Sequence, residues 1–538
     1  MACSQPVRRP TRNLARVSDQ LAVAPPAPSI SFTVDGRAVI VADDGCSLLE
    51  ALRDRLGVRG PKDGCSPQGQ CGCCTVLVDG APRVACVTPA RRVAGREITT
   101  VEGLEPAVAD QWAQAFCAVG GSQCGFCTPG IVVRLAALRE RTEDPSEHAP
   151  VGRALQAHLC RCTGWQTVIE AWDHLGRPSP ERDLDRAGER ATLEGGSPQT
   201  VAPQVALGRG GFADDRSPED ALVAVPDGSG GWTVAETLLE ARHAAGKVQG
   251  RRTTVASLPV LPVVDGSWQS TLRTSWVEPG YLETDATWCV PGGEPASLLA
   301  NGGAFGAKVS SELGAVARRL ADQHGRPVRV LWSREDSVRL GPKRPPVSGG
   351  ANADGAGVLH VVRTPGIVEA VHAVAPKLVI TEVDALGPPT SIDLRAAGWA
   401  EAVILLAGAR GTVGTVQAPA GGQAEAEVVD GRIKVRVRAG DPLDEIVLRS
   451  YIIGAAHMAL SWITSESLTV DPEGEVHDLT IRSLGILRAI DTPPIDVEIE
   501  PSGGPPVNGS DAAFAAVAAA VWLHQGCPTD LPTRRPIT

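Results

Sequence analysis

The sequence predicts an α+β multidomain protein, in which a small sheet domain and a small helical domain precede a larger α+β region. The chain has 538 residues, enough for roughly three or four domains at about 150 residues each. Its hydrophobic pattern changes from short alternating runs to helical periodicity, and then to a mixture of both. With 43% hydrophobic and 21% charged residues, most of the chain can bury a core, which excludes wholesale disorder.

The first two segments are a tail and a sheet domain. Residues 1–28 are predicted to be a flexible N-terminal tail. Residues 29–105 are predicted to form a sheet, because Ile30-Ser31-Phe32-Thr33-Val34 alternates apolar and polar side chains. The dipeptides Asp35-Gly36 and Asp79-Gly80 are typical of two-residue hairpin turns.

A helical domain and a linker follow. Residues 106–176 are predicted to be helical, because Ile131, Leu135 and Leu138 recur on one helix face. Residues 177–204 combine prolines, a charged run and a Gly-Gly-Ser-Pro sequence, which is typical of an interdomain linker.

The remaining residues, 205–538, are predicted to form the larger α+β region. A helical pattern at 312–323 precedes a short apolar strand pattern at 328–331. No internal repeat is visible in this part of the sequence.

Charge and hydropathy exclude several classes of function. The formal net charge of −11 disfavours a protein that binds nucleic acid or an anionic membrane, since both need a basic surface. No run approaches the ~18 apolar residues of a membrane span; the longest candidate, 512–523, stops at His524. Fourteen cysteines without an apolar leader predict metal ligation in a reducing compartment, so a cytoplasmic location is expected.

The first cysteine set has the spacing C-x5-C-x2-C-x11-C and consists of Cys65, Cys71, Cys74 and Cys86. The plant-type [2Fe-2S] signature is C-x4-C-x2-C with a fourth cysteine elsewhere, so this loop has one extra residue. Glycines suit such a loop because backbone N–H groups must approach the cluster sulfurs; they are Gly64, Gly69 and Gly72. The alternative is a structural zinc site with four cysteine ligands. Cys73, inside the loop, is interpreted as a packed thiol.

The second set consists of Cys124, Cys127, Cys160 and Cys162. We expect each pair to open a helix, with Thr128 capping before a proline and with a capping box formed by Thr163 and Gln166. The positive ends of two helices would then stabilise an anionic thiolate cluster. Zinc remains the alternative here too, although it is weaker after a preceding cluster motif.

Together these motifs resemble the iron–sulfur portion of the molybdenum hydroxylases, the xanthine dehydrogenase and aldehyde oxidase family. The residues that carry the resemblance are the eight cysteines, Gln123 before Cys124, and the Thr-Pro-Gly and Thr-Gly that follow the later pairs. The resemblance covers about residues 30–176. It implies two [2Fe-2S] clusters, one in a β-grasp ferredoxin-like domain and one in a helical domain nearest the molybdopterin, which Gln123 would touch.

The last region resembles the family's molybdenum-binding subunit in pieces, and is therefore expected to be molybdopterin-domain-like. These pieces are the loop 302–308 and the segments 326–335, 395–401 and 454–460. By the resemblance, the residues at the cofactor are Gly302, Gly303, Phe305, Gly306 and Arg395. A nucleotide P-loop is excluded at 302–308 because Ala307 follows the last glycine and Val309 follows Lys308. A plain tight turn remains the alternative for this loop.

Two departures from the family argue against molybdopterin binding by this chain alone. The region after residue 205 is much shorter than the family's large subunit. Where the family has Gly-Glu-Pro-Pro with a general-base carboxylate, this chain has Gly503-Gly504-Pro505-Pro506, and glycine cannot accept a proton. Glu500 and Asp511 are the nearest candidate bases. No FAD fingerprint is present, so electrons are expected to leave to a flavin subunit or another acceptor.

The sequence therefore predicts an oxidoreductase component of the molybdenum hydroxylase type. It would move electrons through two [2Fe-2S] clusters between a molybdopterin centre and an external acceptor, and its partner would be a molybdenum-binding large subunit. The alternative is a non-catalytic electron-transfer and assembly module whose last region has lost cofactor chemistry. A zinc-stapled binding protein would require both cysteine sets to be misread.

Overall fold

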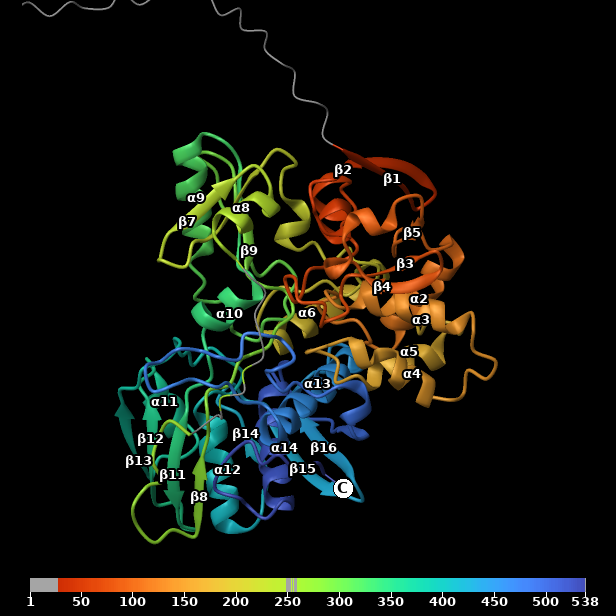
Figure 1. The fold of residues 1–538 in the computed structure, drawn as a ribbon. Coiled ribbons are helices and arrows are strands. Elements are labelled where there is room, and N and C mark those ends of the chain that lie inside the picture. Colours follow the sequence, from red (N-terminus) through yellow and green to blue (C-terminus); the bar gives the residue numbers. More distant parts are fainter. Residues whose placement is uncertain (1–27, 248–252, 254, 256–258, 538) are drawn as a thin grey trace, which may run out of the picture.

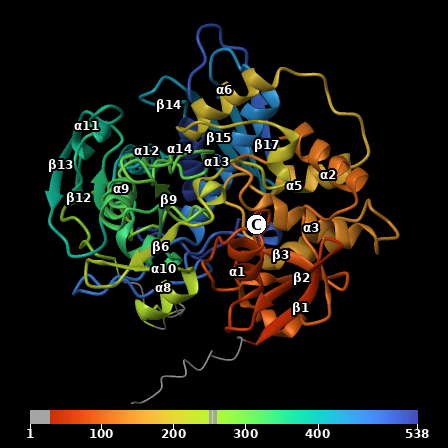
Figure 2. The ribbon, with the colours of Figure 1, turned by 90° about the horizontal axis from the view of Figure 1, so that it is seen from above.

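The computed structural model describes residues 28–247, 253, 255 and 259–537. The predicted N-terminal tail lies outside the described residues apart from Pro28. Figure 1 shows the N-terminal sheet domain and the helical domain side by side, with the larger C-terminal region packed against both, and Figure 2 shows the same arrangement from above. Taken together the domains contain both sheets and helices, so the protein is α+β, as the sequence predicts.

The first domain is built on a five-stranded sheet with the order β2-β1-β5-β3-β4. Both predicted hairpin turns are present, because Asp35-Gly36 and Asp79-Gly80 all have positive φ angles, as a type I′ turn requires. The pairing of β1 with β5 is parallel. The elements are β1 (Ser29–Val34), β2 (Arg37–Ala42), α1 (Leu48–Glu50), β3 (Thr75–Val78), β4 (Ala81–Val84) and β5 (Glu97–Thr99).

The second domain is helical, as predicted. Ile131 and Leu135 are fully buried, and the Trp112 and Trp172 rings pack with centroids 6.1 Å apart. The helices are α2 (Pro106–Ala118), α3 (Thr128–Arg139), α4 (Ala149–Ala154) and α5 (Gln166–His174).

The segment 177–204, which composition predicts to be a linker, contains the helix α6 (Leu184–Gly195). The Asp183 side chain caps α6 by accepting hydrogen bonds from two backbone N–H groups of the first turn, and Gly196 ends it with a left-handed conformation. Ala187 and Ala191 pack against the C-terminal region. The connection between the domains is thus ordered and part of the core. A short helix, α7 (Pro203–Ala206), follows it.

Among its described residues, the C-terminal region contains three four-stranded sheets. The predicted helix at 312–323 and strand at 328–331 are present as α9 and β10. The sheet β7-β6-β10-β9 and its helices comprise β6 (Leu222–Pro226), β7 (Trp232–Ala235), α8 (Leu238–Ala244), β9 (Ala286–Cys289), α9 (Leu313–His324) and β10 (Val328–Leu331). The sheet β13-β12-β11-β8 and its neighbours comprise β8 (Ser270–Arg273), α10 (Arg334–Leu340), β11 (Val347–Ala351), β12 (Gly357–Val362), α11 (Ile367–His372), β13 (Leu378–Val383) and α12 (Trp399–Arg410).

The last sheet, β14-β15-β16-β17, is covered by two apolar helices. The strand β16 explains why: Ile433, Val435 and Val437 are buried, whereas Lys434 and Arg436 between them point to solvent. The elements are β14 (Val416–Gln417), β15 (Gln423–Val429), β16 (Arg432–Arg438), α13 (Glu445–Thr464), β17 (Ile495–Ile499) and α14 (Ser510–His524).

The helix α13 joins this sheet to the helical domain. Small residues allow the close approach, since a Cβ at Gly164 would lie 2.8 Å from the Ile453 carbonyl oxygen, and one at Gly454 would collide with the Cys162 carbonyl oxygen. By length and composition alone α13 could cross a membrane, but 89% of its apolar window is buried inside the protein. That burial fits a core helix.

Candidate iron–sulfur centres

The four thiols of the first set gather beside β3 and β4 and are almost fully buried. Cys65 contacts Cys71, and Cys74 contacts Cys86. Cys65 also contacts Cys86, which connects these two pairs. Their exposed fractions are 1% for the first three and 4% for Cys86. Water is therefore largely excluded from the thiols.

Backbone N–H groups point at these sulfurs, as a thiolate cluster needs. The N–H groups of Gln68 and Gln70 donate to Cys65 Sγ at 3.2 and 3.5 Å, and the Cys86 N–H group donates to Cys74 Sγ at 3.4 Å. The Cys71 and Cys86 thiols, together with these N–H donors, lower the pKa of Cys65 well below its ordinary value, against the effect of burial. This direction favours the thiolate form of Cys65, which is the form that a metal ligand needs.

The second set lies at the start of α3 and before α5. Cys124 Sγ and Cys162 Sγ are 3.6 Å apart, and Cys127 contacts Cys160. Contact with the Cys127 thiol lowers the pKa of Cys160 to about 6, assisted by Thr163 and opposed by burial. In the described part of the chain, no three His, Cys, Asp or Glu side chains converge as the ligands of one ion. The thiols of the second set lie as two pairs, Cys124 with Cys162 and Cys127 with Cys160.

The predicted helix caps at this set are wrong in detail. Cys127, not Thr128, precedes the first residue of α3, and the Thr128 hydroxyl lies 3.1 Å from the Ser122 hydroxyl. The Thr163 hydroxyl lies 3.1 Å from Cys160 Sγ and accepts a hydrogen bond from the Trp165 N–H group, so it forms no capping box. The Thr163 hydroxyl thus contacts the Cys160 thiol and does not cap the helix α5.

The loop 302–308 lies directly against the second set. A Cβ at Gly303 would be 2.8 Å from Cys124 Sγ and 3.8 Å from Cys162 Sγ, and Gly303 has a φ angle of +82°. Next to it, Asn301 Nδ2 donates to the Cys124 carbonyl oxygen at 2.7 Å. A side chain at position 303 would fill the space beside the sulfurs. Gly306 is equally tight, because a Cβ there would collide with the Asp393 carbonyl oxygen.

Gln123 faces α13. Its Nε2 atom donates to the Cys162 carbonyl oxygen at 3.0 Å and to the Ser450 hydroxyl at 2.9 Å, while its Oε1 atom is buried without a partner among the described residues. The donor side of this amide is therefore used to hold α13 against the second set.

Arg395 connects the loop to the C-terminal helices. Its guanidinium lies 4.7 Å from the centroid of the Phe305 ring, its Nη2 atom donates to the Glu194 carbonyl oxygen at 2.8 Å, and its Nε atom contacts Asp511 Oδ1 at 3.2 Å. Burial raises the pKa of Asp511, and the Arg395 charge opposes this rise. Of the two carboxylates suggested by the sequence, Asp511 is the one that contacts Arg395.

Glu500 and Gly504 lie elsewhere. Glu500 forms ion pairs with Arg436 and Arg438 on β16. Gly504 is exposed, and a Cβ there would meet no atom within 4 Å. The position that corresponds to the family's carboxylate is thus open to solvent.

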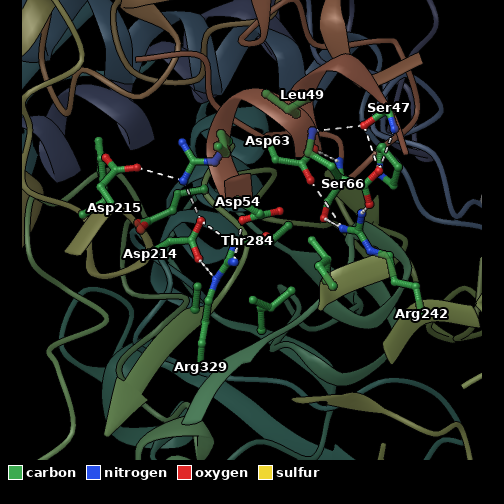
Figure 3. A pocket seen from close by; sticks show the side chains of 18 of the residues that line it. Ser47, Leu49, Asp54, Asp63, Ser66, Asp214, Asp215, Arg242, Thr284 and Arg329 are labelled. Atoms are coloured by element: carbon green, nitrogen blue, oxygen red, sulfur yellow. Dashed lines mark hydrogen bonds and ion pairs between the residues drawn. The ribbon is translucent and has the colours of Figure 1, made fainter. Parts of the chain in front are cut away.

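A pocket lies between the first domain and the C-terminal region, and residues of both line it (Figure 3). Its cavity is about 40 Å³. Arg329 of β10 contacts Asp54 at 2.7 Å. Asp214 contacts Arg53 at 2.7 Å and also forms an ion pair with Arg329. Figure 3 shows the side chains of Arg329, Asp54 and Asp214 pointing toward one another across the boundary, and Arg242 contacting Ser66 of the first cysteine loop.

Comparisons with known proteins decide the family. A family model described as a [2Fe-2S] binding domain matches residues 100–173. The nicotine 6-hydroxylase small subunit of Paenarthrobacter nicotinovorans is 40% identical over 151 residues, which are 27% of this chain and 90% of that protein. This chain belongs to the molybdenum hydroxylase family.

Longer members of the molybdenum hydroxylase family match over a small part of their length. Aldehyde oxidoreductase of Megalodesulfovibrio gigas is 40% identical over 163 residues, which are 29% of this chain but 18% of that protein. The solved structure of aldehyde oxidoreductase from Desulfovibrio desulfuricans superposes with a TM-score of 0.68 over 94% of this chain and 99% of that one, at 14% identity. The C-terminal region therefore shares that fold.

The residues around the loop 302–308 do not fit a molybdopterin as they stand. The two cavities that touch them have volumes of about 10 and 30 Å³. Such volumes hold about one or two waters, whereas pockets for drug-sized ligands span roughly 300 to 1,000 Å³. The buried ion pair of Arg161 with Glu466 borders the larger cavity, and so does Arg344, which is paired with Glu401 behind it. A molybdenum hydroxylase that binds its own molybdopterin needs more room here.

Sequence reasoning missed the side chains that join the cluster loops to the C-terminal region. Arg161 lies between two cysteines of the second set, and its unusual place was the only available signal. Arg334 Nη2 donates to the Gly64 carbonyl oxygen at 2.7 Å, and Arg482 contacts the loop that follows Cys65. Arg334 lies in the segment 326–335 that resembles the family, but no local pattern indicates its contact with Gly64 or that of Arg482 with Gln70, because 270 and 412 residues separate these partners.

Proposed function

We propose that this chain binds two [2Fe-2S] clusters and works as an electron-transfer component of the molybdenum hydroxylase type. The paired arrangement of the thiols supports this most directly. A [2Fe-2S] cluster with four thiolates needs two of them on each iron. The first set offers the pairs Cys65 with Cys71 and Cys74 with Cys86. The second set offers Cys124 with Cys162 and Cys127 with Cys160.

The contact between the two sets supports electron transfer from one cluster to the other. The Cys71 carbonyl oxygen accepts a hydrogen bond of 2.9 Å from the Leu159 N–H group, and Leu159 directly precedes Cys160. The backbone at Cys73 also lies against α3, since a Cβ at Gly130 would be 2.9 Å from the Cys73 carbonyl oxygen. A ligand of each cluster is thus joined by a few covalent bonds and one hydrogen bond.

We assign the molybdopterin to a partner, a molybdenum-binding large subunit, rather than to this chain. The small cavities beside the loop 302–308, the glycine at position 504 and its exposure all support this assignment. A flavin subunit or another external protein would then be the electron acceptor. The same observations favour the second candidate, a non-catalytic assembly module whose C-terminal region is a packed scaffold. We place the chain in the cytoplasm, because no disulfide joins its described cysteines.

Metal analysis of anaerobically purified full-length chain tests the proposal. About four irons, about four acid-labile sulfides and no stoichiometric molybdenum are expected, because each set holds one two-iron cluster. Cys71→Ser should remove one paramagnetic signal and Cys124→Ser the other, whereas the control Cys117→Ser, a thiol of α2 outside both sets, should keep both.

Three results would contradict the proposal. Zinc in place of iron would refute the clusters, and loss of both signals in either ligand variant would refute independent sites. Stoichiometric molybdenum in the chain purified alone would refute the partner assignment. Activity that requires an added molybdenum subunit would favour the first candidate over the assembly module.

A further inference from the structure

The segment 479–482 of the C-terminal region lies on the loop of the first cysteine set. Gln68 Oε1 accepts a hydrogen bond of 3.1 Å from the Ile481 N–H group, and Gln68 Nε2 donates to the Leu479 carbonyl oxygen at 2.9 Å. Arg482 contacts Gln70 twice, with its N–H group 3.3 Å from Oε1 and its Nε atom 3.1 Å from the carbonyl oxygen. These contacts hold both residues that flank Gly69.

These two glutamines also supply the N–H groups that donate to Cys65 Sγ. Gln68 is further fixed by a hydrogen bond of 2.8 Å from its Nε2 atom to Glu335 of α10, so both ends of its amide are used. The C-terminal region thus sets the position of the N–H donors at the thiolate. Hydrogen bonds to cluster sulfurs are one of the factors that set a reduction potential.

Arg482 adds a positive charge at the same place. Its guanidinium is anchored on neutral acceptors, the carbonyl oxygens of Gln70 at 3.1 Å and Gln156 at 2.8 Å. Within the described residues it forms no ion pair with a carboxylate, whereas Arg488, six residues later, pairs with Asp491 at 2.7 Å. Burial lowers the pKa of Arg482, the charge of Arg488 lowers it further, and the Cys71 and Cys65 thiolates oppose both effects.

We propose that the positive charge of Arg482 raises the reduction potential of the first cluster, so that the C-terminal region tunes the electron path. Reduction adds one electron and no proton, and makes the cluster with its thiolates more negative by one charge. A nearby cation and fixed N–H donors favour that more negative state. The inference rests on the proposed function, because it requires a cluster on the first cysteine set.

The test is a dithionite redox titration of the full chain followed by electron paramagnetic resonance. The first-cluster signal is identified as the one that Cys71→Ser removes. Arg482→Met should lower the equilibrium constant for one-electron reduction of this cluster about tenfold, which corresponds to a fall of 59 mV in its reduction potential. The second-cluster potential should not change. Arg482→Lys keeps the charge and should retain most of the potential, and the control Arg488→Met should leave it near that of the unchanged chain.

An unchanged first-cluster potential in Arg482→Met, with both signals present, would overturn this inference alone. So would an equal fall in Arg482→Lys, because the charge would then not be the cause. An equal shift of both clusters in Arg482→Met would show a general loosening and would also overturn it. Absence of the first signal from the unmutated chain would overturn the proposed function itself, and this inference with it.

Discussion

The buried ion pair between Arg161 and Glu466 holds the second cysteine set against the C-terminal region. The side chains are 4% and 1% exposed, and Arg161 Nη2 lies 2.8 Å from Glu466 Oε2. Arg161 also donates from Nε to the Pro279 carbonyl oxygen at 2.9 Å. Glu466→Gln keeps the shape but removes the negative charge, and leaves the guanidinium buried and uncompensated.

Breaking a buried pair by removing one partner costs about 3 to 5 kcal/mol, so Glu466→Gln should destabilise the helical domain by about that amount. Urea unfolding followed by loss of the second-cluster signal measures this cost. The double variant Arg161→Leu with Glu466→Leu removes both charges, so its destabilisation should be clearly smaller than the sum of the two single effects. A change below about 0.5 kcal/mol in Glu466→Gln, or full additivity in the double variant, would refute the reasoning.

Three further predictions follow from single contacts. Gly303→Ala should lower the iron content from about four to about two atoms per chain, because the new Cβ would lie 2.8 Å from Cys124 Sγ. The control Gly292→Ala also has a positive φ but open space around it, so it should keep its full iron content. Equal iron contents in the two variants would contradict this prediction. Arg329→Met should destabilise the interdomain contact in urea unfolding by about 1.5 to 3 kcal/mol, because it removes the 2.7 Å partner of Asp54 and leaves Asp214 with Arg53 alone; unfolding like that of the unchanged chain would count against it. Burial raises the pKa of Glu283 to about 7 against the effect of Lys308, so the folded state binds more protons than the unfolded state. The free energy of unfolding should therefore fall as pH rises from about 4.5 to about 7, and Glu283→Gln should remove that part of the slope; an unchanged slope would show that Glu283 does not cause it.

The local parts of the fold were predictable from the sequence, because short-range physics decides them. Asp35-Gly36 forms its turn since both residues accept positive φ, and the helix at α9 follows its apolar periodicity. The cysteine spacings placed four thiols in each set, and the thiols of each set do lie together.

The remaining features depend on partners far away in the sequence. Composition favoured a linker at 177–204, although Asp183 and Gly196 are ordinary helix boundary signals that could have indicated α6. Thr163 matches the sequence pattern of a capping box, but its hydroxyl contacts Cys160 Sγ instead. Arg482 and Gln70 are 412 residues apart in the sequence, so no short-range pattern can predict their contact.

The central claim is that one chain holds two independent [2Fe-2S] clusters, and spin quantification tests it most directly. The full chain, reduced with dithionite under anaerobic conditions, should give about two unpaired electrons per chain in two distinguishable signals, because each reduced cluster contributes one. Cys124→Ser should give about one spin, carried by the signal of the first cluster. A single spin and a single signal in the unmutated, iron-replete chain would contradict the account.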